Sequence, residues 1–284
     1  MKIKVEEDGE LLEYLYNHLD MSKKKIKSYL THGSIYVNQT KTTKYNYKVT
    51  KGMTILIDTK NKNSSNLVFD ILYEDDYIIV VNKPSGLLTI STAKEKEKTL
   101  YHLVGEYLKR KNKNNKVFIV HRLDKDTSGI VLFAKDEKTK NKLQKDWNNI
   151  VKVREYTAVV LGNLEHKKGR LVNKLMETKT NLVYITNKQE GKEAITNYEV
   201  IKKSKDYSLL KINIDTGRKN QIRVQLANIG NPIVGDNKYG KNLKKYNRLY
   251  LHACRLTLFY PMLKKEITFN ALVPKEFKKL VWEF

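Results

Sequence analysis

The chain has 284 residues, of which 40% are hydrophobic, and a formal net charge of +24. This length allows one large domain and a small one, and the positive charge makes a polyanion the first candidate partner. A single cysteine, Cys254, excludes an internal disulfide and a cysteine-based zinc site. No apolar signal region and no long apolar segment occur, so we expect a soluble, cytoplasmic protein with no membrane partner.

Residues 1–58 are predicted to form a small α+β unit. Leucines between positions 11 and 19 recur at helical spacing. A second helix is predicted to begin after Ser22 as N-cap and to end at Gly33, and strands are expected at 35–38 and 54–57. The second helix carries a group of lysines, which form either a solvated face or an RNA contact: Lys23, Lys24, Lys25 and Lys27.

Residues 59–66 contain no apolar side chain and are predicted to form a linker. A second domain is expected over residues 67–284. Several of its predicted strands follow one another without a helix between them, which favours an α+β fold with a mixed, largely antiparallel sheet. The predicted strands cover 77–82, 117–120, 130–134, 155–161, 195–201, 208–214 and 249–259, and the predicted helices cover 100–111, 139–148 and 223–229.

The most informative segment is the polar stretch 121–129, which joins two strands rich in Val, Ile and Phe. It contains Arg122, Asp124 and Asp126. Polar loops held on a rigid scaffold are where catalytic groups tend to sit. The same spacing is equally typical of a tight hairpin with Asp at its corner and Gly129 for a positive φ. Spacing alone leaves both interpretations open.

Three further segments stand out. Lys83-Pro84-Ser85-Gly86 forms a predicted turn after an apolar strand. Residues 154–162 alternate like a strand and include Tyr156. Residues 215–226 run from a Gly turn into a helix and carry two arginines, Arg218 and Arg223. The Gly/Pro-rich loop 230–240 and His252 are expected to be architectural.

The string from His121 to Gly129 resembles the signature of the RluA-type pseudouridine synthases. The Tyr-x-Ala-x-Val segment at 156–160 and the Thr-Gly-Arg and Gln-Ile-Arg elements at 216–223 are similar to further motifs of that family. This chain departs from the pattern at Asn220 and Gln225, where histidines are common. Residues 1–58 resemble the S4 RNA-binding module, although the usual arginine before Leu11 is absent.

The resemblance implies isomerisation of specific uridines to pseudouridine in a structured RNA, with ribosomal RNA the first expectation and transfer RNA the second. It implies that Asp124 is the nucleophile, that Tyr156 stacks on the target base and that Arg223 pairs with Asp124. Arg122 is expected to replace the displaced base or hold its backbone, and Arg218 to contact RNA. The family needs no metal and no organic cofactor, and we expect a monomer.

Three other functions fit part of the sequence. A non-catalytic RNA-binding or ribosome-assembly protein explains the charge, but it does not explain an Asp, Arg and Tyr set spread over three segments. A glycosidase using Asp124 with Asp126 would break the same kind of bond, yet it leaves the +24 charge without purpose. An RNA methyltransferase would need a Gly-rich turn after an early strand, and the sequence has none.

Overall fold

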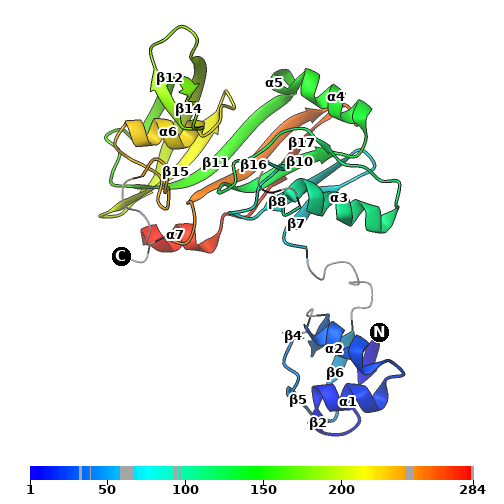
Figure 1. Cartoon of the computed structure of the whole chain (residues 1–284). Coiled ribbons are helices and arrows are strands. Elements are labelled where there is room, and N and C mark those ends of the chain that lie inside the picture. The colour runs from blue at the N-terminus through cyan, green and yellow to red at the C-terminus, as the bar shows by residue number, and fades with distance from the viewer. Residues whose placement is uncertain are drawn as a thin grey trace. The chain divides into compact units, whose positions relative to one another are not determined.

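The chain folds into two units, residues 1–67 and 68–284, which we describe separately (Figure 1). The computed structural model describes residues 1–31, 34–38, 40–57, 67–92, 95, 97–240 and 246–282. The linker expected at 59–66 and the helix stop expected at Gly33 lie outside the described residues.

The first unit packs two short helices against a small antiparallel sheet. Helices α1 (Leu11–His18) and α2 (Lys23–Thr31) bury Leu15, Ile26 and Leu30 against sheet residues such as Ile55. The four lysines of α2 point away from this core and are exposed. The strands are β1 (Lys2–Lys4), β6 (Thr54–Ile57), β3 (Ile35–Val37) and β4 (Thr40–Thr42) in that order, and β2 (Gly9–Glu10) pairs with β5 (Lys48–Val49).

The second unit is built on one large sheet with the order β13-β12-β14-β15-β11-β16-β10-β8-β7, to which β17 adds on β16 and β9 on β10. This confirms the α+β class with a mixed, largely antiparallel sheet. The strands are β7 (Asp70–Glu74), β8 (Ile78–Lys83), β9 (Phe118–Ile119), β10 (Ser128–Ala134), β11 (Val151–Leu161), β12 (Lys168–Glu177), β13 (Val183–Thr186), β14 (Lys192–Lys203), β15 (Tyr207–Ile214), β16 (Leu251–Tyr260) and β17 (Lys265–Asn270).

Helices cover the two halves of this sheet separately (Figure 1). Helix α6 (Gln221–Asn228) packs on β12, β13 and β14, whereas α4 (Glu137–Lys145) and α5 (Trp147–Ile150) pack on strands around β10, β11 and β16. Helix α3 (Leu100–Lys111) begins at its N-cap Thr99, and α7 (Lys275–Trp282) packs on β11 and β15. The helix expected at 139–148 is two helices, because the helical backbone is interrupted at Asp146. This residue is at the C-cap position of α4 and the N-cap position of α5.

Strands β10 and β16 form the one parallel pairing among the described strands. Gly129 pairs with Ala253 there and has a φ of +116°. A Cβ at this position would lie 2.2 Å from the backbone oxygen of Ala253, so only glycine permits the approach. This contact brings the end of the 121–129 segment against β16, at the centre of the sheet.

Candidate active site

Asp124 lies on a broad loop rather than at the corner of a tight hairpin. Strands β9 and β10 pair through Ile119 and Phe133, so residues 120–127 form a long excursion between them. Thr89 fixes this excursion: its hydroxyl donates to the Leu123 carbonyl at 2.7 Å and accepts from the Leu123 N–H at 3.2 Å. The backbone therefore presents the half-buried Asp124 side chain from a restrained loop.

The turn after β8 holds this loop through hydrogen bonds. Lys83 is fully buried, and its ammonium group donates to the carbonyls of Pro84, Leu87 and Lys125 at 3.0, 2.7 and 2.9 Å. Burial lowers the pKa of Lys83 to about 7, against the opposing effect of nearby carboxylates. Ser85 donates to the Asp126 carbonyl at 2.6 Å. The turn thus has a structural role in holding the Asp124 loop.

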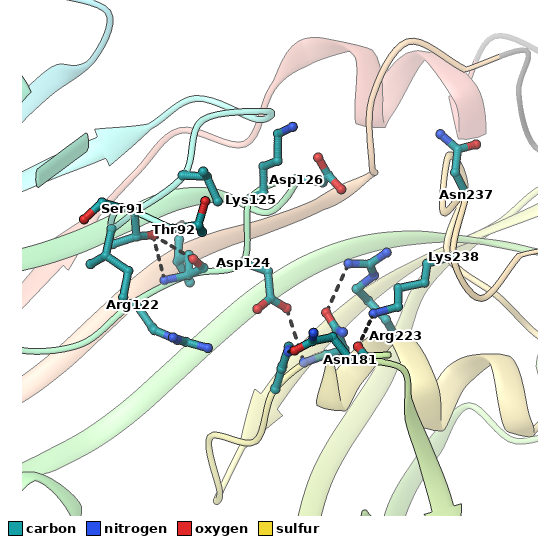
Figure 2. Close-up of a pocket in the computed structure, with 16 residues that line it drawn as sticks. Ser91, Thr92, Arg122, Asp124, Lys125, Asp126, Asn181, Arg223, Asn237 and Lys238 are labelled. Atoms are coloured by element: carbon teal, nitrogen blue, oxygen red, sulfur yellow. Dashed lines mark hydrogen bonds between the residues drawn. The ribbon is translucent and has the colours of Figure 1, made fainter. Parts of the chain in front are cut away.

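A cavity of about 590 Å³ opens in front of Asp124 (Figure 2). One wall is the loop with Arg122 and Asp124, together with residues 88–92. The opposite wall includes Arg223, Lys238 and Asn181. In Figure 2, Asp124 points from its loop toward this second wall. A smaller pocket of about 90 Å³ shares Asp124 and Arg223 with the cavity and extends to Tyr156.

Tyr156 lies on β11 at an irregularity in the ladder. The register with β16 shifts between Glu155 and Tyr156, and such bulges change the direction of a side chain. The tyrosine is half-buried and lines the small pocket. Burial raises the pKa of its hydroxyl to about 12; Asp124 adds to the rise and Arg154 opposes it. The phenol therefore stays protonated at neutral pH.

Arg223 does not make the expected pair with Asp124. Its guanidinium forms two hydrogen bonds to Asp236, Nη2 to Oδ1 at 2.7 Å and Nε to Oδ2 at 2.8 Å. Among the described residues it forms no ion pair with Asp124. A carboxylate from the loop after α6 occupies the Nε–Nη2 edge of the guanidinium instead. Asp124 still contributes an attraction to Arg223 through space.

The hydrogen bond to the Asp124 carboxylate comes from backbone instead. The N–H of Asn220 donates to Asp124 Oδ2 at 3.3 Å. Gln221 shapes the turn before it, since its Oε1 accepts from the Thr216 hydroxyl at 2.8 Å and the Arg218 N–H at 3.0 Å. Gln225, the second departure from the family pattern, points away into the core, where its Nε2 donates to Asn173 Oδ1 at 2.8 Å.

The remaining predicted residues divide between the two units. Arg122 and Arg218 are exposed and line the small pocket, so the structure brings them together with Asp124, Tyr156 and Arg223. The α2 lysines belong to the other unit. His252 is buried, as expected, and its Nδ1 lies 2.8 Å from the Ser128 hydroxyl.

Sequence reasoning missed several residues that shape the site: Lys83 as a buried donor, Asn220 as the partner of Asp124, and Asp236 with Tyr239 around Arg223. Lys83 and Asn220 lay inside segments already singled out, but only three-dimensional contacts give them their roles. Within the described part of the chain, no group of three or more His, Cys, Asp or Glu side chains could hold a metal ion. No described helix has the length and apolar character needed to cross a membrane.

Comparisons with known proteins show the family of this chain. The sequence matches the family described as RNA pseudouridylate synthase over residues 77–228. The RNA pseudouridine synthase YhcT of Bacillus subtilis is 32% identical over 286 residues, which cover 98% of this chain and 94% of the relative. The ribosomal large subunit pseudouridine synthase D of Blochmanniella floridana is 30% identical over 309 residues, covering 99% and 96% of the two chains.

A solved structure shows the same fold. The human RNA pseudouridylate synthase domain containing 4 superposes with a TM-score of 0.62 at 24% identity, over 74% of this chain and 90% of that one. The family match spans more than half of the sequence, and the relatives align over nearly all of it. The chain therefore belongs to the RNA pseudouridylate synthase family and is an RNA pseudouridine synthase, an isomerase.

Proposed function

We propose that this enzyme converts specific uridines of ribosomal RNA to pseudouridine with Asp124 as the nucleophile. The observation that carries the proposal is the position of Asp124, which lines both the large cavity and the small pocket that ends at Tyr156. A nucleotide backbone in the large cavity could deliver one base into the small pocket. Asp124 would then lie at the junction of sugar and base.

The reaction conserves all atoms. The bond between ribose C1′ and uracil N1 breaks, the base rotates, C1′ bonds to C5, the C5 proton is lost and N1 gains a proton. A carboxylate can serve by attacking C1′, by attacking C6 or by taking the 2′ proton, and covalent catalysis divides one difficult displacement into two easier steps. Because the reacting atoms are hidden in a stacked helix, the nucleotide must leave the stack or be unpaired already.

The other site residues take roles around this step. Tyr156 stacks on the extruded base, a contact worth about 1–3 kcal/mol, and its protonated hydroxyl is a donor rather than a base. Arg122, exposed on the Asp124 loop, occupies the place the base leaves. Arg223, anchored on Asp236, places positive charge near Asp124. Arg218 lies exposed at the rim of the small pocket, where RNA passes.

Support for ribosomal RNA comes from the relatives. Pseudouridine synthases D of the ribosomal large subunit from several bacteria align with this chain at 29–30% identity. The first unit, with its exposed lysines on α2, would act as an S4-like RNA-binding domain in addition to the catalytic domain. Phosphate contacts of this kind provide affinity without reading sequence.

The test is to incubate the full chain with large-subunit ribosomal RNA transcripts and, separately, with transfer RNA, and to map pseudouridine chemically. We expect defined sites in the ribosomal RNA. Sites in transfer RNA alone would reassign the substrate. RNA binding without any product would favour the alternative of a ribosome-assembly protein and overturn the catalytic proposal.

A further inference from the structure

We propose that Asn220 is a positioning residue for Asp124, and that Tyr239 holds Asn220 in the orientation this requires. The inference rests on the proposed function, in which Asp124 is the nucleophile.

The backbone of Asn220 carries the first part of the argument. Its N–H donates to Asp124 Oδ2 at 3.3 Å, and this is the hydrogen bond that the Asp124 carboxylate accepts among the described residues. Asn220 has φ 53° and ψ 18°, the left-handed region, immediately before α6. Asparagine enters this region more readily than most residues. The direction of the N–H toward Asp124 therefore depends on a backbone conformation that few side chains tolerate.

The side chain of Asn220 is fixed at both ends of its amide. Its Oδ1 accepts from Arg223 Nη1 at 3.1 Å, and its Nδ2 donates to the Tyr239 hydroxyl at 3.1 Å. Arginine is only a donor, so the oxygen must face Arg223 and the nitrogen must face Tyr239. Asn220 is 7% exposed, which leaves little room for another arrangement. The two bonds together hold the left-handed residue in place.

Tyr239 connects this residue to the rest of the domain. Its hydroxyl also accepts from the N–H of Val183 on β13 at 3.1 Å, and its ring lies 5.3 Å from the guanidinium carbon of Arg223. The Tyr239 N–H in turn donates to Asp236 Oδ1 at 3.0 Å. Tyr239 thus joins β13, α6 and the loop after α6 at one point. Because these contacts restrain Asn220, they also restrain the direction of its N–H toward Asp124. This neutral donor orients the carboxylate without neutralising its charge.

The experiment compares variants of the full chain in single-turnover reactions at saturating RNA. Asn220→Ala loses both side-chain bonds and places a Cβ in left-handed backbone, so the rate should fall about tenfold to a hundredfold, as expected when a reacting group shifts by about 1 Å. Asn220→Gly loses the same bonds but keeps the left-handed conformation at low cost. It should retain more activity than the alanine variant.

Tyr239→Phe keeps the ring and removes the hydroxyl, so it should lower the rate less than Asn220→Ala while leaving the Kd for RNA within about twofold. The matched control is Asn38→Ala. Asn38 is also left-handed, with φ 46°, and its side chain accepts from the Thr54 N–H at 2.9 Å, but it lies in the first unit. Its single-turnover rate should equal that of the parent.

Three results would overturn the inference. The folded Asn220→Ala variant could keep the parent rate, or it could lose only affinity for RNA. The third such result is a lower rate for Asn220→Gly than for Asn220→Ala. If the alanine variant does not fold, Asn220→Gly and Tyr239→Phe decide it: parent rates in both overturn it. Failure of the proposed function gives a different result, because the parent protein would then form no pseudouridine in ribosomal RNA, or Asp124→Asn would keep its activity.

Discussion

Arg223 and Asp236 form a buried, two-point ion pair between α6 and the loop that follows it, with side chains 7% and 0% exposed. Burial would raise the pKa of Asp236, but the hydrogen bonds and charge of Arg223 outweigh it and lower that pKa. Burial would lower the pKa of Arg223, and Asp236 reverses that effect as well. The guanidinium is thereby held in the wall of the cavity that Asp124 also lines.

Replacing Arg223 with lysine should slow the chemical step. Lysine keeps the charge but cannot form the planar, two-point contact with Asp236, and it also loses the donor to Asn220. We expect a single-turnover rate reduced by about tenfold or more, with the Kd for RNA nearly unchanged. Stopped reactions at saturating RNA and a filter-binding titration measure both. Weaker binding with a normal rate would instead make Arg223 a phosphate contact.

The two carboxylates of the loop should differ sharply. Asp124→Asn keeps the shape of the side chain but removes the nucleophile, so pseudouridine formation should be lost while thermal unfolding is unchanged. Asp126→Asn should cost far less, because Asp126 contributes its backbone oxygen to Ser85. The pair is a matched control in charge and position. Activity in Asp124→Asn within about tenfold of the parent, or equal losses in both variants, would contradict the nucleophile assignment.

The lysines of α2 should contribute to RNA affinity and not to the chemical step. A variant with glutamine at all four positions keeps the buried face of the helix. If three or four phosphate contacts are lost, the slope of log affinity against log salt should become shallower by about two to three units. The single-turnover rate at saturating RNA should stay at the parent value.

The matched control replaces four exposed lysines of the second unit with glutamine: Lys188, Lys202, Lys205 and Lys265. It makes the same change in net charge and should alter the salt slope less. Equal slopes for the parent and the α2 variant would show that these lysines are a solvated helix face.

His252 should make the fold sensitive to acid. Burial, followed by the charge of Arg248, lowers the pKa of His252 to about 4. Below its ordinary pKa of about 6.5 the unfolded chain takes up a proton that the folded chain refuses. Stability is therefore lost as pH falls from about 6.5 to about 4, by up to about 3 kcal/mol for this group.

His252→Gln can keep a hydrogen bond to Ser128 but does not titrate. Its midpoint of urea unfolding should therefore fall less between pH 7.5 and pH 4.5 than that of the parent. The first pH lies about one unit above the window and the second about half a unit inside it. Half-buried His121, whose pKa desolvation also lowers to about 4, leaves part of the pH dependence of stability in this variant. The control is His166→Gln, an exposed position whose side chain is 74% accessible. Parallel pH curves for His252→Gln and the parent would refute the assignment.

The sequence predicts helices and strands correctly where their apolar spacing or capping residues are clear. Helix α3 and strand β6 have the expected bounds, and Thr99 caps α3 through the His102 N–H at 3.3 Å. Strand β12 was missed because its apolar residues do not follow its two faces: Gly169 and Asn173 stand at half-buried positions, whereas Val172 is exposed. In such a strand the apolar period is too weak to distinguish it from a loop.

The candidate site shows the same division. Asp124, Tyr156 and Arg223 were predicted from the resemblance of local motifs, and the structure brings all three to one pocket. The partner of Arg223 was not predicted, because Asp236 lies 13 residues away in a loop expected to be architectural. A contact that depends on the path of a loop leaves no periodic trace in the sequence. The donor to Asp124 is a backbone N–H, which side-chain identity does not reveal.

The place of β16 in the sheet sets an order for biosynthesis. This strand, residues 251–260, lies between β10, which follows the Asp124 loop, and β11, which carries Tyr156. Before β16 has left the ribosome, β10 and β11 each have an unpaired edge on the side where β16 will bind. Such edges can pair with other chains. The active site is completed only after β16 has been synthesised, so a chain that stops before β16 lacks the central contact and leaves these edges unpaired.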